Sequence, residues 1–71
     1  GSLTNLSKEM IYLAVSITNR CEYCARSHIK SAKNKGMTNK MLNELIAVVA
    51  MASETNRLVE SYQVEVDDFL K

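Results

Sequence analysis

The chain of 71 residues has no proline or tryptophan, and it has only two cysteines and one histidine. Two cysteines are too few for a protein built on a disulfide framework. No apolar run approaches the length of a membrane span, and no signal peptide precedes the first expected helix. Nine basic residues nearly balance eight acidic ones, so we expect no nucleic-acid partner. We therefore expect a cytoplasmic protein with no membrane association.

Hydrophobic residues make up 46% of the sequence, a high share for so short a chain. We expect a single domain over residues 3–71, because Gly1-Ser2 is typical of the remnant of a cleaved expression tag. A domain of this size buries little apolar surface by itself. We therefore expect a homo-oligomer.

The spacing of apolar residues predicts an all-α fold, a small bundle of about four helices. The first helix covers 3–19, with Thr4 or Ser7 as its N-cap. The second begins near Cys21 and ends before Gly36, which suits a C-terminal cap. Lysines 30, 33 and 35 lie near that end, where cations complement the helix dipole.

Thr38 is expected to cap a third helix that reaches about Ser53. Most of its circumference is apolar, so it should be buried on several sides, in part by another subunit. Residues 53–56 should end it and start a fourth helix through Tyr62. A last turn follows, capped by Asp67.

The only cysteines and the only histidine fall within eight residues, Cys21-Glu22-Tyr23-Cys24-Ala25-Arg26-Ser27-His28. Residues three or four apart share a helix face, so both thiols and the imidazole can converge. A Cys-X-X-Cys pair in an intracellular chain indicates a redox dithiol. The imidazole can take the thiol proton and so raise the fraction of reactive thiolate.

Two other interpretations of this cluster remain open. Cys21, Cys24 and His28 offer three zinc ligands, with Glu9 or water as a fourth, although a structural zinc site normally has four protein ligands. Alternatively, the cysteines are small core residues in a structural protein. Glu9 lies at the edge of the apolar stripe, where a solvent-facing side chain is the simplest interpretation. We expect no bound metal and no cofactor beyond the redox-active pair.

Four features of the sequence occur together: Asn19-Arg20-Cys21-Glu22-Tyr23-Cys24, His28, Gly36-Met37-Thr38, and Glu9, which lies twelve residues before the first cysteine. With these features the chain resembles the AhpD-like core of the carboxymuconolactone decarboxylase superfamily over roughly residues 6–52. Asn56-Arg57 is a weaker match.

This resemblance implies an all-helical fold that assembles as trimers or hexamers and an antioxidant enzyme that reduces peroxides. It implies that Cys24 is the peroxidatic residue, oxidised to a sulfenic acid, and that Cys21 is the resolving residue and proton donor. Glu9 and His28 match the acid–base relay. The disulfide is then reduced by an external thiol carrier of the lipoyl or thioredoxin type.

Two departures from the family pattern matter. Tyr23 stands where the best-known branch has a second histidine, so its phenol is a candidate replacement in the relay. The chain also corresponds to one core repeat of the two-repeat peroxidase. The family's lactone decarboxylases generally lack the dithiol, which favours peroxidase or general thiol–disulfide oxidoreductase activity.

The choice between the two sulfurs also follows from the residues. The helix dipole favours a thiolate at Cys21, the cysteine nearest the helix start. His28 lies four residues after Cys24 and is the nearer base for it. The dipole contributes about 0.3–1 kcal/mol, whereas a positioned base contributes roughly 10²–10⁴-fold in rate. We therefore expect Cys24 to attack the peroxide.

Overall fold

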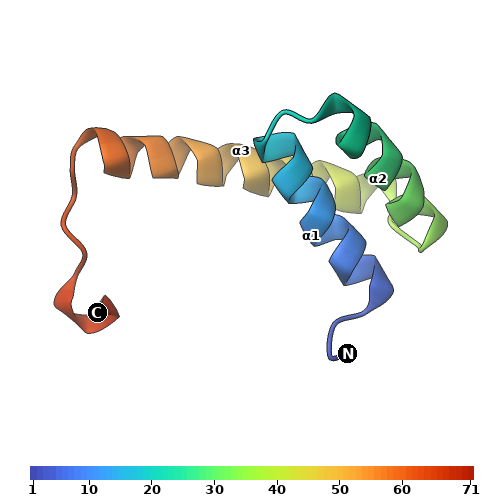
Figure 1. Cartoon of the computed structure of the whole chain (residues 1–71), viewed down its shortest axis with the longest axis horizontal. Coiled ribbons are helices and arrows are strands. Elements are labelled where there is room, and N and C mark those ends of the chain that lie inside the picture. The colour runs from blue at the N-terminus through green and yellow to red at the C-terminus, as the bar shows by residue number, and fades with distance from the viewer.

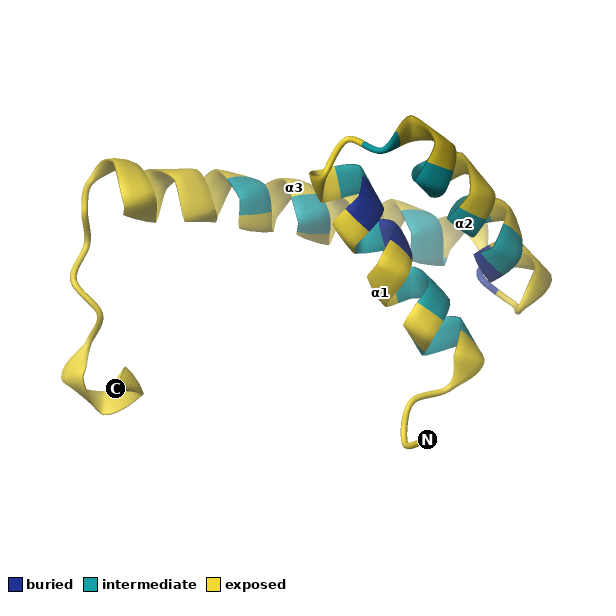
Figure 2. Ribbon diagram, in the orientation of Figure 1, coloured by how far each residue is buried: buried dark blue, intermediate teal, exposed yellow.

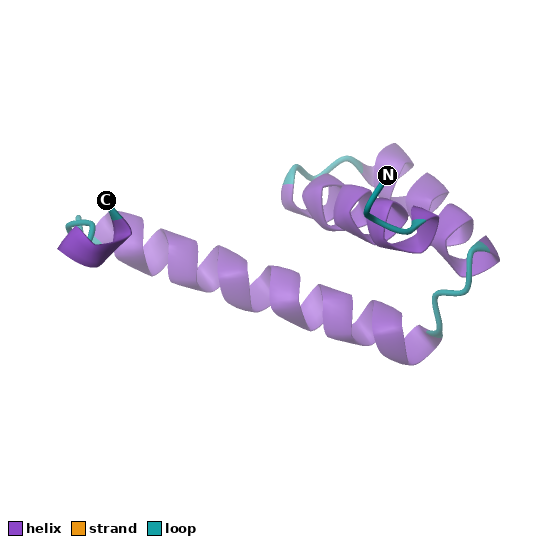
Figure 3. Cartoon of the chain, turned by 90° about the horizontal axis from the view of Figure 1, so that it is seen from below, coloured by secondary structure: helices purple, strands orange, loops and turns teal.

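The structure is a computed structural model that describes all 71 residues, and every regular element in it is helical (Figure 3). The α-helices span Asn5–Thr18 (α1), Glu22–Asn34 (α2) and Asn39–Ser61 (α3), and a single 3-10 turn spans Asp68–Leu70 (η1). The predicted all-α class is confirmed. None of the helices combines the length and apolarity that crossing a bilayer requires.

Side-chain caps mark the starts of α1 and α3, and a glycine follows the end of α2. Thr4 Oγ1 accepts a hydrogen bond from Ser7 N at 3.0 Å, so Thr4 rather than Ser7 caps α1. Thr38 Oγ1 accepts from Met41 N at 3.1 Å and caps α3, as predicted. Gly36 follows α2 with a φ of 109°, a left-handed conformation that a glycine adopts without strain.

The helix break predicted at residues 53–56 is wrong, because α3 continues through this stretch as one helix of 23 residues. Ser, Thr and Asn are good capping residues, but no glycine or proline is present to end the helix. The Arg57 guanidinium donates to the Ser53 carbonyl oxygen at 3.4 Å, one turn back. Asp67 precedes η1 as predicted, although its side chain makes no capping hydrogen bond.

The core forms where α1 packs against α2 and the first half of α3 (Figures 1 and 2). Leu13 of α1 and Ala32 of α2 are fully buried, and Met37 and Leu45 are nearly so. Partly buried apolar residues surround them: Leu6, Met10, Ala14, Ile17, Ala25, Ile29, Met41, Leu42 and Val49. This packing fixes one face of α1 against α2, and the candidate site lies between these two helices.

The second half of α3 and the C-terminal segment extend away from the core, and the molecule measures 42 × 28 × 20 Å (Figure 1). Large apolar side chains on these parts are exposed: Met51, Leu58, Val59, Val64, Val66, Phe69 and Leu70. The prediction that the third helix is buried on several sides is therefore wrong within one chain. Burial by another subunit stays a prediction.

Candidate active site

The two cysteines lie at the start of α2 and are joined as a disulfide, with their Cα atoms 5.3 Å apart. Cys21 is the N-cap residue, and its Sγ accepts a hydrogen bond from Cys24 N at 3.3 Å. The first turn of a helix has backbone N–H groups without helical partners, and its dipole favours negative charge. A thiolate at either sulfur is therefore favoured once the disulfide is reduced.

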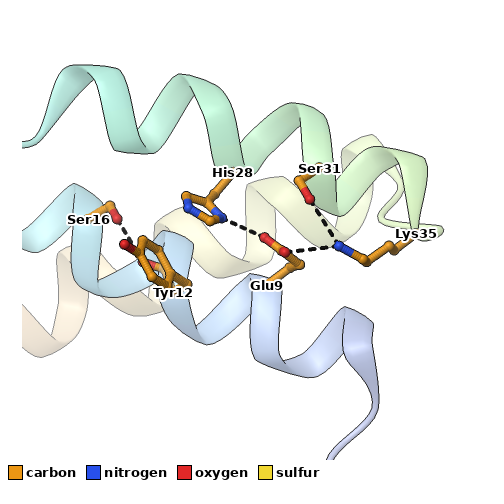
Figure 4. Close-up of polar contacts among 6 residues, drawn as sticks. All are labelled: Glu9, Tyr12, Ser16, His28, Ser31 and Lys35. Atoms are coloured by element: carbon orange, nitrogen blue, oxygen red, sulfur yellow. Dashed lines mark hydrogen bonds and ion pairs between the residues drawn. The ribbon is translucent and has the colours of Figure 1, made fainter.

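His28 lies one turn after Cys24 and pairs with a carboxylate from α1. Its Nδ1 donates a hydrogen bond to Glu9 Oε2 at 2.6 Å (Figure 4). A carboxylate can only accept, so Nδ1 carries a hydrogen and, in the neutral ring, Nε2 has the free lone pair. Figure 4 shows the second ring nitrogen pointing away from Glu9, toward the N-terminal end of α2. The disulfide lies at that end of the helix.

Glu9 is held from both sides. Its Oε1 accepts a hydrogen bond from Lys35 Nζ at 2.9 Å, and the same ammonium group donates to Ser31 Oγ at 3.0 Å (Figure 4). The side chain is only 18% exposed, so the solvent-facing interpretation of Glu9 is wrong. The hydrogen bond from His28, followed by that from Lys35, lowers the pKa of Glu9 from 4.5 to about 2, against an opposing effect of burial.

Two tyrosines lie near the site, and they differ in their contacts. The Tyr12 ring stacks on the His28 imidazole, with ring centroids 3.8 Å apart and an interplanar angle of 26°. Tyr23 lies between the cysteines in sequence, is 84% exposed and makes no side-chain hydrogen bond within the chain. The aromatic ring that contacts His28 thus comes from α1. A relay role for the Tyr23 phenol stays a prediction.

Sequence reasoning missed three residues of this site, namely Tyr12, Ser31 and Lys35. A signal was present, because residues 28, 31 and 35 are spaced three and four apart and so share a face of α2. Tyr12 similarly lies one turn after Glu9 on α1. What the sequence did not disclose is that these two faces meet.

A surface pocket of about 240 Å³ opens beside the disulfide. It is lined by Cys21 together with Ser16, Ile17, Arg20, Glu22 and Ala25. A small molecule can therefore reach the Cys21 side of the disulfide. No three His, Cys, Asp or Glu side chains lie close enough together to hold a metal ion.

This helical core is shared with known proteins. The chain belongs to the carboxymuconolactone decarboxylase family, whose model matches residues 1–64. Its fold is that of the AhpD core. It superposes on the crystal structure of the alkylhydroperoxidase AhpD core from Rhodospirillum rubrum with a TM-score of 0.95 and 49% sequence identity.

The match covers 100% of this chain and 53% of the Rhodospirillum chain. A second relative is uncharacterized protein 4 in the cox locus of Paracoccus denitrificans, 36% identical over 50 residues. Those residues are 70% of this chain and 45% of that protein. The chain thus spans about half the length of both relatives. The AhpD-like resemblance stated above is confirmed.

Proposed function

We propose that this protein is an antioxidant thiol peroxidase of the alkylhydroperoxidase type. The observation that carries the proposal is the pairing of His28 with Glu9, one helical turn after Cys24 of the disulfide. The family includes both peroxidases and decarboxylases, so membership alone does not choose between them. A redox dithiol next to a carboxylate-oriented imidazole supports peroxide reduction, which needs a thiolate and a proton shuttle.

In the first step, His28 Nε2 takes the proton of the reduced Cys24 thiol. The thiolate attacks one peroxide oxygen, the O–O bond breaks, and Cys24 becomes a sulfenic acid. The imidazolium returns its proton to the departing alkoxide, which leaves as an alcohol. Glu9 stabilises the imidazolium throughout, since its carboxylate accepts the Nδ1 hydrogen.

In the second step, the Cys21 sulfur attacks the Cys24 sulfur and closes the disulfide. The hydroxide that departs from the sulfenic acid takes the Cys21 proton and leaves as water. An external dithiol of the lipoyl or thioredoxin type then supplies two electrons and two protons. It becomes a disulfide itself and returns both cysteines to thiols.

A general thiol–disulfide oxidoreductase is the second candidate. The pocket beside Cys21 favours it, because a thiol or disulfide of a partner molecule can approach a sulfur there. This reaction uses the same dithiol but requires no oxygen transfer, so the two candidates differ in whether peroxide is consumed.

Peroxide consumption by the reduced protein tests the proposal. We expect turnover of an alkyl hydroperoxide with a dihydrolipoyl donor or a thioredoxin system, and none in Cys24→Ser. Turnover of a disulfide substrate without peroxide consumption would instead favour the oxidoreductase.

A further inference from the structure

Lys35 is the charged residue beside the relay that the mechanism above does not use. It follows α2 directly as its C-cap residue, and its side chain reaches back toward α1 (Figure 4). Its ammonium group makes two hydrogen bonds, one to Glu9 Oε1 at 2.9 Å and one to Ser31 Oγ at 3.0 Å. The ion pair is partly screened from water, with 38% of the Lys35 side chain and 18% of the Glu9 side chain exposed.

The two oxygens of Glu9 are therefore divided between two partners. Oε2 accepts from His28 and Oε1 accepts from Lys35, so the plane of the carboxylate is fixed from both ends. A glutamate side chain has several rotatable bonds, and ordering it costs up to about 2 kcal/mol of conformational entropy. A second charge-assisted hydrogen bond limits this freedom without competing for the oxygen that holds the imidazole.

On the basis of the proposed function, we propose that Lys35 is a positioning residue of the relay formed by Glu9 and His28. It holds the Glu9 carboxylate in the orientation in which Oε2 accepts the Nδ1 hydrogen of His28. Nε2 then keeps its direction toward the disulfide end of α2. Lys35 itself contacts neither sulfur nor substrate, so its effect passes entirely through Glu9 and His28.

Other charged groups do not duplicate this contact. From α2, Glu9 is faced by His28, Ser31 and Lys35, and from its own helix Tyr12 stacks on the His28 ring. No residue of α3 forms an ion pair with Glu9. The lowered pKa of Glu9, to which the Lys35 hydrogen bond contributes, agrees with a carboxylate held between two donors.

Lys35→Met tests the proposal, because methionine keeps a similar length and loses the ammonium group. We expect kcat/KM for an alkyl hydroperoxide to fall about tenfold, the cost of a loosened catalytic geometry. We also expect the Glu9 carboxyl, followed by its carbon-13 NMR signal, to titrate at a higher pH than in the native protein. Lys35→Arg should restore both quantities, since arginine keeps the charge and the reach.

Lys33→Met is the matched control, an exposed lysine two residues away with no ion pair. Equal behaviour of Lys35→Met and Lys33→Met in both measurements would overturn the proposal. A shifted Glu9 titration with unchanged kcat/KM would also overturn it, because Lys35 would then be a structural ion pair only. If the native protein consumes no peroxide, the proposed function fails. An unshifted Glu9 titration in Lys35→Met would overturn this proposal independently of that result.

Discussion

The Glu9 carboxylate and the His28 imidazole lie 2.6 Å apart, although nineteen positions separate them in the sequence. They come from α1 and α2, the two helices whose fully buried residues Leu13 and Ala32 belong to one core cluster. The Glu9–His28 pair is therefore assembled by helix packing.

Removal of the Glu9 charge should slow the reaction. In Glu9→Gln the amide no longer stabilises a protonated His28, so we expect peroxide turnover to fall about a hundredfold with the helical content and thiol count unchanged. Glu54→Gln is the control, because Glu54 is exposed on α3 and forms no ion pair. A native rate in Glu9→Gln would remove Glu9 from the relay.

The same glutamate should make the stability depend on pH. Its pKa is about 2 in the folded chain, against an ordinary value of 4.5. A lowered pKa means that its stabilising effect is complete above pH 4.5 and is lost as the pH falls toward 2.

Denaturant unfolding at several pH values between 7 and 2 measures this effect. The free energy of unfolding of the native protein should decline toward that of Glu9→Gln across the acid range. A difference between the two proteins that stays constant down to pH 2 would contradict the low pKa.

The Tyr12 ring should steady the His28 imidazole on which it stacks. Aromatic stacking contributes about 0.5–1.5 kcal/mol, so Tyr12→Leu should slow peroxide turnover roughly twofold to tenfold. Tyr12→Phe keeps the ring and should retain the native rate. If Tyr12→Phe is as slow as Tyr12→Leu, the phenol oxygen rather than the stacked ring is what matters.

We propose that the chain assembles as a homo-oligomer, as a trimer or hexamer. The reason is the apolar surface that α1 and α3 leave exposed, including Ile11, Val48 and Met51. Sedimentation velocity should show this oligomer, and Val48→Glu should shift it toward monomers because it places a charge on that surface. Lys40→Glu, at the polar start of α3, should leave it intact. A stable native monomer at micromolar concentration contradicts the proposal.

Much of the fold followed from local signals in the sequence. Thr38 marks the start of α3 because its hydroxyl accepts a hydrogen bond from a first-turn N–H group. Gly36 marks the end of α2 because glycine adopts the left-handed conformation that ends many helices. The false break at residues 53–56 shows the limit of such signals. Residues that can cap a helix do not end it when nothing prevents continuation, and α3 runs on to Ser61.

The site was predictable only in part, because some of its contacts lie within one helix and others join two helices. The spacing of Cys21, Cys24 and His28 within one helix indicates that they share a face. The contacts of Glu9 with His28 and Lys35 join two helices, so they depend on the packing of α1 against α2. Glu9 was identified through a family resemblance. Lys35 and Tyr12 were not marked by that resemblance, and their helical spacing became informative only once the structure showed that the two helix faces meet.

The most direct test of the proposed mechanism is to identify the sulfur that peroxide oxidises. Each single-cysteine protein, Cys21→Ser and Cys24→Ser, is reduced, treated with an alkyl hydroperoxide in the presence of a sulfenic-acid trap, and analysed by mass spectrometry. Because His28 lies one turn from Cys24, we expect an adduct at Cys24 in Cys21→Ser and none in Cys24→Ser. An adduct only at Cys21 would reverse the assignment, and no adduct in either protein would contradict the peroxidase function itself.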